Sequence, residues 1–447
     1  MKTARAERDT ELDGVTSSAL DAHWKKNEGR GERPIPSDGS LEASFALMRD
    51  GYSFISKRCA RLGTDIFRTR MMLTPAICMR GAEAAKVFYG GQRFTRVGAM
   101  PMTTLLLLQD VGSVQLLDGA AHRRRKAMFM AMMTPEALER MPSLYREEWK
   151  AALLRWQKRR RVVLHYAVYE VLTRAAIRWA GMPLVERDVR LHTRELSAMI
   201  ESAGSIGPAN WWAQSLRRRS ERWAQSIIAG ARSGAIPMPP GSPLAIICEH
   251  TDADGNRLDD NVAAVELLNV VRPIVAVARF ITFAALALHE HPQWRERFAS
   301  GDEADLDGFE HEVRRFYPFF PMIGGRVVEP FSWLGYPFKK SDWVLLDLYG
   351  TNHDERLWPE PGRFRPERFR DWAGDPYTLI PQGGGAYETG HRCPGEWLTM
   401  GLIREAVRLL SRTRYDVPDQ DLSISLRKMP ALPASGFVIA NVGGLSP

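Results

Sequence analysis

The chain has 447 residues, 45% of them hydrophobic and 26% charged, so it can bury a large core. We find no internal repeat with a period of about 20 to 50 residues, which argues against a solenoid or a propeller. No apolar run reaches about 18 uncharged residues and no signal-type stretch opens the chain, so we expect a cytoplasmic protein without an integral membrane span. The net charge is +8, but no recognised binding module accompanies it, and we expect no nucleic-acid partner.

The predicted elements are mostly helical. Residues 1–33 are polar and poor in aromatic side chains, which predicts a flexible extension ahead of one domain over 34–447. Apolar residues at helical spacing predict a helix over 134–158, and a Pro-rich loop over 235–243 links two helices. A longer apolar helix is predicted over 259–291, ended by Pro292.

Strand signals are short and lie in the second half of the chain. We expect a small sheet from 326–328, 331–338 and 343–348, with a turn at Gly335, and a terminal hairpin of 422–426 with 436–440. The predicted fold class is therefore mainly α with a small β region.

Cys393 stands out because of its surroundings. It lies in a loop that reads Pro381-Gln-Gly-Gly-Gly-Ala-Tyr-Glu-Thr-Gly-His-Arg-Cys-Pro-Gly-Glu396, directly before a helix-like run over 396–410. A helix start and adjacent cations lower the pKa of a thiol, and such a thiolate suits the axial position of haem iron. The alternative is an inert buried cysteine, which is what most single cysteines are.

The other cysteines, Cys59, Cys78 and Cys248, are widely spaced and form no metal-ligand pattern or disulfide framework. We interpret them as ordinary core or surface residues.

Two further motifs precede the cysteine loop. Glu312 and Arg315 lie three residues apart on one helical face and can form an ion pair, which Arg368 of Phe364-Arg-Pro-Glu-Arg-Phe369 could join. In this order, the three motifs resemble the cytochrome P-450 superfamily, with its Glu-x-x-Arg helix, its meander and its haem-thiolate loop. The resemblance implies the P-450 fold and haem b, with iron bound by Cys393.

The loop also differs from the usual superfamily pattern. Ala386 and Thr389 stand where most members carry Phe and Gly, inside a lengthened Gly-rich stretch. This loop resembles that of the bacterial fatty-acid peroxygenases, and the likeness extends from about Pro36 to Val438. It implies a medium- or long-chain fatty acid and hydrogen peroxide as substrates, with no redox partner. It also implies that the haem propionates are bound by His122, Arg125, Lys126 and His391.

Arg272 and Pro273 occupy the middle of the predicted long helix, where an oxygen-activating P-450 carries an acid–alcohol pair. Neither residue can act as a general acid near neutral pH. Arg272 is the only charge in an apolar run, so it needs an anionic partner. One interpretation is a structural salt bridge. The resemblance favours the other, in which Arg272 binds the fatty-acid carboxylate and that carboxylate serves as general acid–base for cleavage of peroxide, with Pro273 opening space beside it.

The resemblance also suggests substrate contacts. It places Gln115 beside the reacting end of the substrate, where members that release terminal alkenes tend to carry histidine. Candidates for an apolar channel around the tail are Leu105 to Leu108, Phe319, Phe320, Met322, Ile323, Leu432 and Phe437, although each could equally be plain core. Gln109 and Asp110 depart from the family pattern, and they leave chain-length preference open.

Three other functions stay open from the sequence. A fatty-acid decarboxylase would release terminal alkenes, and a conventional monooxygenase would need ferredoxin or flavin partners. A haem-binding sensor or isomerase would use no oxidant. Product analysis with a fatty-acid panel and hydrogen peroxide distinguishes them.

Overall fold

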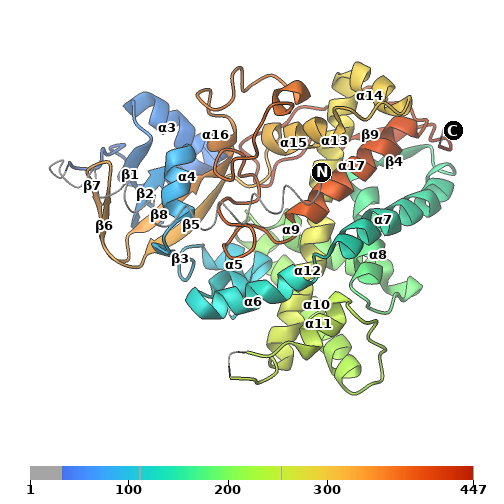
Figure 1. Cartoon of the computed structure of the whole chain (residues 1–447). Coiled ribbons are helices and arrows are strands. Elements are labelled where there is room, and N and C mark those ends of the chain that lie inside the picture. The colour runs from blue at the N-terminus through green and yellow to red at the C-terminus, as the bar shows by residue number, and fades with distance from the viewer. Residues whose placement is uncertain (1–32, 110–111, 253, 446–447) are drawn as a thin grey trace.

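The computed structural model describes residues 33–109, 112–252 and 254–445. The expected N-terminal extension over 1–33 therefore lies almost wholly outside the described residues, as does Asp110. In the described part, helices dominate and a small sheet lies at one side of the molecule (Figure 1). The predicted fold class is confirmed.

The helices are α2 (Ser44–Asp50), α3 (Phe54–Leu62), α4 (Ala82–Tyr89), α5 (Met102–Leu108), α6 (Gly119–Ala131), α7 (Pro135–Trp156), α8 (Leu164–Trp179), α9 (Val189–Glu201), α10 (Pro208–Arg232), α11 (Pro243–Glu249), α12 (Asp260–Ala276), α13 (Ala278–Glu290), α14 (Pro292–Ala299), α15 (Leu306–Phe316), α16 (Leu348–Asn352) and α17 (Glu396–Arg412). Local signals explain their ends. Thr134 caps α7 by accepting a hydrogen bond from the Ala137 N–H, and Pro135 follows at the first helical position. The helix predicted over 134–158 is confirmed.

The strands are β1 (Ile66–Met71), β2 (Thr74–Met79), β3 (Phe94–Thr95), β4 (Arg161–Val163), β5 (Met322–Val327), β6 (Phe331–Trp333), β7 (Tyr336–Phe338), β8 (Trp343–Asp347) and β9 (Val438–Ala440). The main sheet has the order β1-β2-β8-β5-β3. Only the pair β2 and β8 is parallel, and the other neighbours are antiparallel. The N-terminal strands β1 to β3 were absent from the sequence-based prediction.

The predicted terminal hairpin is wrong. β9 pairs with β4, in the register Val162 with Ile439, while the segment over 422–426 contributes one isolated bridge between Ile424 and Pro433. The predicted partners are close in sequence, but β4 lies far upstream. Sequence proximity therefore misled the prediction, because pairing follows the packed core rather than chain order.

The predicted long helix over 259–291 is two helices, α12 and α13, separated at Val277. Proline has no N–H, so Pro273 leaves the carbonyl of Asn269 without its helical donor. Four residues later the Val277 N–H bonds to the carbonyl of Ile274, three residues back instead of four. The helical hydrogen-bonding pattern is thus interrupted at Val277, on the C-terminal side of Arg272.

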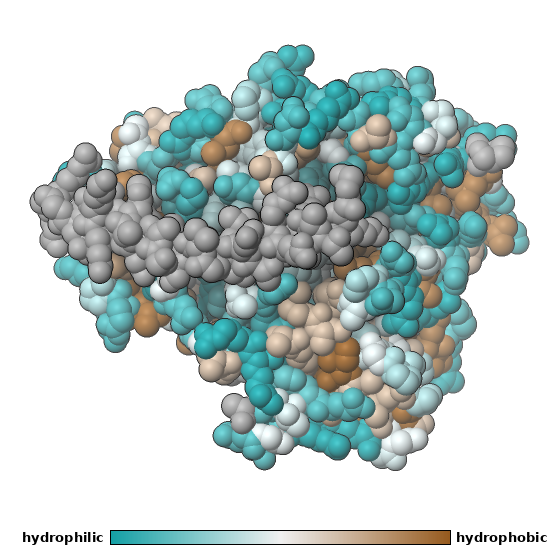
Figure 2. All heavy atoms as spheres, in the orientation of Figure 1, coloured by the Kyte–Doolittle hydropathy of each residue, from teal (hydrophilic) through white to brown (hydrophobic). Residues whose placement is uncertain are grey.

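α12 and α13 belong to the largest core cluster, in which α12 packs against α8, α9 and α10, and α13 packs against α8 and α17. Together they are long and apolar enough to cross a membrane by composition, but 89% of the relevant window is buried inside the molecule. That burial identifies them as core helices of this fold. Figure 2 shows a mostly hydrophilic face, on which apolar side chains gather in small groups.

Candidate active site around Cys393 and Arg272

Cys393 is presented by a tightly packed loop at the start of α17. The loop needs its glycines: Gly385 has a φ of 80°, and a Cβ there would lie 2.8 Å from the Cβ of Tyr89 in α4. The Cys393 N–H donates to the carbonyl of Gln382 at 3.3 Å, and the Gln382 side-chain amide lies 3.9 Å from the Cys393 Sγ. The thiol is therefore held in one position before any cofactor binds.

Burial raises the pKa of the Cys393 thiol, although Lys126 opposes that effect. The sequence predicted the opposite direction from the helix start and the cations. Desolvation is the larger effect here because the loop covers the sulfur on the protein side. A metal ion bound to the thiol would reverse this, because a coordinating thiol is deprotonated.

A buried ionic network connects α15 with the meander. Glu312 accepts hydrogen bonds from Arg315 at 2.6 and 2.8 Å and from Arg368 at 3.3 Å, and all three side chains are buried. The predicted three-residue network is confirmed. Closer to the loop, Glu396 pairs with Arg314 and, at 2.6 Å, with Arg392. Glu396 thus ties α15 and the cysteine loop to the start of α17, and Glu312 ties the meander to α15.

Four basic groups lie together next to the loop: Arg96, His122 and Lys126, which are buried, and His391, which is half-buried. His122 and His391 stack with ring centroids 3.9 Å apart, and Lys126 donates to the carbonyl of Arg392. Burial lowers the pKa of His122 to about 4 and, with Arg96 adding to the effect, that of His391 to about 2. Burial also lowers the pKa of Lys126 to about 8. Among the described residues, no carboxylate lies within ion-pair distance of these four groups.

This arrangement fits haem. Within the described ranges the two cations of the cluster, Arg96 and Lys126, form no ion pair, and the two propionates of haem would supply their counter-charge. Cys393, adjacent to the cluster, offers one thiolate to the iron. The sequence analysis missed Arg96. No motif around it in the sequence indicates that it is buried, or that it lies beside histidines that are distant in the sequence.

Arg125, also predicted to contact a propionate, has a different partner in the structure. Its Nη1 donates to the Glu266 carboxylate at 2.6 Å. Glu266 is fully buried in α12 and also accepts a hydrogen bond from the Val114 N–H at 2.9 Å. Arg125 therefore ties α6 to α12 through Glu266, and a propionate contact stays a prediction.

Arg272 is buried in α12 with 4% of its surface exposed. Its Nη1 donates to the carbonyl of Leu107 at 2.7 Å, and its Nη2 donates to the carbonyl of Leu108 and to Asn269 Oδ1 at 3.2 Å. The guanidinium thus lies against the end of α5, the segment that was predicted to contribute to the channel. Gln115 lies in the 3-10 turn Val114–Leu116, and its buried Oε1 has no hydrogen-bond partner among the described residues.

Apart from the leucines of α5, the residues predicted to contact the substrate tail follow two segments that the hydroxyl of Tyr52 brings together. It donates to the carbonyl of Phe319 at 2.8 Å and accepts from the Ala431 N–H at 3.4 Å. Phe320 and Leu432 are the next residues in each segment. Phe320 is 41% exposed and Leu432 is half-buried. Phe437 is fully buried in the main core cluster, so it packs as core instead of lining a channel.

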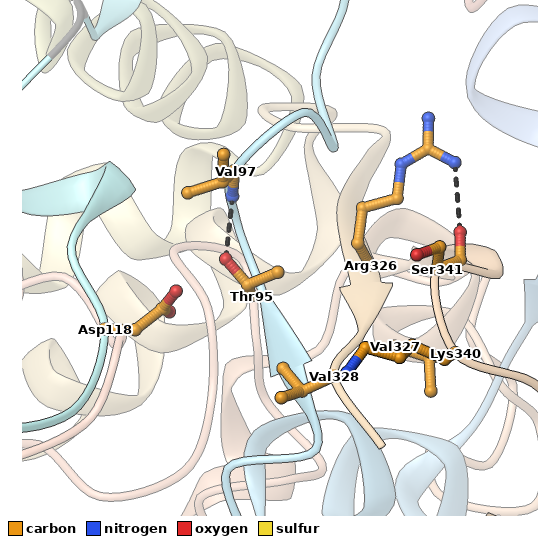
Figure 3. A pocket seen from close by; sticks show the side chains of 8 residues that line it. All are labelled: Thr95, Val97, Asp118, Arg326, Val327, Val328, Lys340 and Ser341. Carbon is orange, nitrogen blue, oxygen red and sulfur yellow. Dashed lines mark hydrogen bonds between the residues drawn. The ribbon is translucent and has the colours of Figure 1, made fainter. Parts of the chain in front are cut away.

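A surface hollow lies apart from these residues. It is lined by Thr95, Val97, Asp118, Arg326, Val327, Val328, Lys340 and Ser341 (Figure 3). None of the predicted site residues lines it. Its polar groups are partly used within the protein, since the Val97 N–H bonds to Thr95 and Arg326 bonds to the carbonyl of Ser341.

The comparisons with known proteins agree with this site. A family model described as Cytochrome P450 matches residues 306–429, which hold the Glu312 network and the cysteine loop. Among curated relatives, Taxoid 2-alpha-hydroxylase of Taxus canadensis is 23% identical over 86% of this chain and 84% of its own length. Rhazimal synthase of Alstonia scholaris is 30% identical over 42% of each chain.

Solved structures are more similar. Cytochrome P450SP alpha (CYP152B1), in complex with (R)-ibuprophen, is 44% identical with a TM-score of 0.88, over 90% of this chain and 99% of that one. Cytochrome P450EX alpha (CYP152N1) with myristic acid is 38% identical with a TM-score of 0.88, over 92% and 99%. A variant of cytochrome P450 OleT with arachidonic acid is 34% identical with a TM-score of 0.90, over 93% and 100%.

The fold and site therefore define a haem-thiolate oxidoreductase of the cytochrome P450 superfamily. Within that class, the chain belongs to the CYP152 family of peroxygenases. Its cofactor is haem b, with Cys393 as the axial thiolate ligand.

Proposed function

We propose that this protein uses hydrogen peroxide to hydroxylate fatty acids at the alpha or beta carbon. The observation that carries the proposal is the pair Arg272 and Pro273 in α12, which puts a buried cation where a protein proton donor would otherwise lie. The fatty acids bound in two of the similar structures support an acid as substrate. No redox partner is required, because peroxide supplies both the oxygen atom and the oxidising equivalents.

Arg272 binds the substrate carboxylate bidentately, since a guanidinium matches the geometry of a carboxylate. The bound carboxylate takes a proton from one oxygen of hydrogen peroxide and returns it to the other, so that this oxygen leaves as water. The remaining oxygen atom is inserted into a C–H bond: peroxide and fatty acid become water and hydroxy acid. Haem, when bound, supplies the redox chemistry that joins these two halves.

Regioselectivity follows from anchoring the head group. With the carboxylate held near the cofactor, only the alpha and beta carbons reach the oxidant. Phe320, Leu432 and the residues of α5 contact the tail, and His122, Lys126, His391 and Arg125 hold the propionates. Gln115 lies beside the reacting end, where an amide can hydrogen-bond but cannot titrate. We therefore expect hydroxy acids in place of terminal alkenes.

The test is product analysis with a panel of saturated fatty acids. The wild type should form 2- or 3-hydroxy acids with hydrogen peroxide, and none with ferredoxin or flavin partners and NAD(P)H. Arg272→Ala should lose acid oxidation about 100-fold or more in kcat/KM, because a transition-state contact is removed. Arg272→Lys keeps the charge without the bidentate geometry, so its kcat/KM should lie between those of the wild type and Arg272→Ala.

A short carboxylic acid provides the second arm. Added to the wild type, it should bind at Arg272 and permit oxidation of substrates that lack a carboxylate, and Arg272→Ala should not respond to it. Haem content and the carbon-monoxide spectrum serve as controls for folding. Normal fatty-acid turnover by Arg272→Ala would show that Arg272 is only a structural ion-pair partner.

A further inference from the structure

Arg272 is one end of a buried polar chain that runs along one face of α12. Glu266, Asn269 and Arg272 are spaced three residues apart, so their side chains follow one another on that face. Their exposed fractions are 0%, 7% and 4%. The surrounding residues of the helix are apolar, so each polar group depends on its neighbours in the chain.

The hydrogen bonds between these three side chains all run from donor to acceptor in one direction, from Arg272 towards Glu266. Asn269 Nδ2 donates to Glu266 Oε2 at 3.0 Å, and Asn269 Oδ1 accepts from Arg272 Nη2 at 3.2 Å. A carboxylate only accepts and a guanidinium only donates, so the Asn269 amide has one satisfied orientation. The backbone carbonyl of Asn269 also lacks its helical donor, because Pro273 has no N–H.

The same carboxylate also holds the turn that carries Gln115. Glu266 Oε1 accepts from the Val114 N–H at 2.9 Å and from Arg125 Nη1 at 2.6 Å. One buried group thus connects Arg272 in α12, the Gln115 turn and the basic helix α6. These three elements carry the proposed contacts to the substrate carboxylate and to its reacting end, and part of the proposed contacts to the propionates.

We propose that Glu266 and Asn269 are positioning residues, which set the orientation of the Arg272 guanidinium relative to Gln115 and so determine where the substrate's alpha and beta carbons lie. The proposal rests on the proposed function, because it needs the carboxylate at Arg272. Glu266 touches neither substrate nor cofactor. It acts through the Asn269 amide on one side and through the Val114 N–H on the other.

Glu266→Gln tests the direction of the chain. The new amide can keep its oxygen towards Arg125 and the Val114 N–H, but its NH2 group then faces Asn269 Nδ2. The Asn269 amide has to flip, and two donors meet at Arg272. We expect kcat/KM for a saturated acid to fall about tenfold or more and the ratio of 2-hydroxy to 3-hydroxy product to change, since small displacements of a positioned group cost catalysis.

A second substitution should reverse this effect. In the double variant Glu266→Gln with Asn269→Asp, the carboxylate at 269 accepts from both the amide at 266 and Arg272, so each donor again faces an acceptor, although the bond between 266 and 269 now runs the other way. We expect the product ratio to return towards the wild-type value. KM should stay raised, because the negative charge now lies next to Arg272 and competes with the substrate. A merely structural role would not produce this recovery.

Asn269→Leu removes the hydrogen bonds to both Arg272 and Glu266 but leaves Glu266 bound to Arg125 and the Val114 N–H, and it keeps the test decisive if the Glu266 variants fold poorly. Glu405→Gln is the matched control, because Glu405 is a buried carboxylate bound to Arg146 in another part of the core. Its product ratio should be that of the wild type. Fatty-acid binding is measured by the change in the haem absorption spectrum, which separates an effect on binding from an effect on turnover in each variant.

Two outcomes overturn the inference and remain distinguishable from failure of the proposed function. If Arg272→Ala is inactive while Glu266→Gln and Asn269→Leu keep the wild-type product ratio and kcat/KM, Arg272 needs no positioning. If the double variant behaves no better than Glu266→Gln alone, the matching of donors and acceptors is irrelevant. Full activity of Arg272→Ala instead rejects the proposed function itself.

Discussion

At the residue scale, we predict that Gln115 selects the product. Its Oε1 is buried and, within the described ranges, has no hydrogen-bond partner. A buried acceptor without a partner is costly, so this oxygen is suited to a donor that arrives with the substrate or with water. Because glutamine cannot exchange a proton near neutral pH, it holds the reacting end without adding acid–base chemistry.

Replacing Gln115 by histidine adds a group that titrates near neutral pH. We expect Gln115→His to raise the share of terminal alkene at the expense of 3-hydroxy acid, measured by gas chromatography from one saturated substrate. Gln109→His is the matched control, since Gln109 also has a buried Oε1 without a partner but lies at the end of α5. Alkene as the main product of the wild type would contradict the role given to position 115.

At the scale of elements, we predict that Pro273 lowers the stability of α12 and alters the shape of the site. Pro273→Ala restores an N–H that can bond to the Asn269 carbonyl, so the free energy of unfolding should rise by about 1 to 3 kcal/mol. Straightening α12 should also shift Arg272 and alter the ratio of hydroxy acids. Urea unfolding and product analysis measure the two effects.

Pro142→Ala provides the comparison for that prediction. Pro142 also lies inside a helix, α7, but it packs beside α17 at Gly401. The substitution should stabilise the protein without changing the product ratio. An unchanged ratio in Pro273→Ala as well would show that the break in α12 plays no part in selectivity.

A second ionic group joins α8, α9 and α13. Glu201 accepts from His165 at 3.0 Å and from Arg279 at 2.7 Å. Burial alone would raise its pKa, but His165 and Arg279 outweigh burial and hold the pKa at about 2, below the ordinary 4.5. A carboxyl with a depressed pKa in the folded state stabilises the protein above its unfolded pKa.

That stabilisation should be lost as the pH falls from about 4.5 towards 2. Glu201→Gln should lower stability at pH 7, because Arg279 loses its partner, and should make the acid-dependent decline shallower. Chemical unfolding at a series of pH values measures both. Parallel declines in the two proteins would contradict the assignment.

At the scale of the whole molecule, the Glu312 network connects α15 with the meander, two segments that precede the cysteine loop in the sequence. Glu312→Gln leaves Arg315 and Arg368 buried without their carboxylate, so we expect a loss of about 3 to 5 kcal/mol in the free energy of unfolding. Haem release on warming should accelerate in parallel. The absorbance of the bound cofactor measures this release. Glu360→Gln removes an exposed partner of Arg363 and should change neither quantity measurably.

The sequence by itself determined the class of fold, the ion pair of Glu312 with Arg315, and the cysteine loop with its supporting glycines. These features depend on neighbours within a few residues, where helical spacing, backbone freedom and capping are decided locally. The interruption of the long helix was also foreseeable from Pro273, although its location at Val277 was not.

Only the tertiary structure decided which distant groups meet. It paired β9 with β4 instead of with 422–426, gave Arg125 the carboxylate of Glu266, and placed Arg96 beside His391. It also made Phe437 core and raised the pKa of the Cys393 thiol where the local sequence predicted a lower one. The physical reason is common to all: pairing and desolvation depend on which segments the folded core brings together, and no local pattern of residues encodes that proximity.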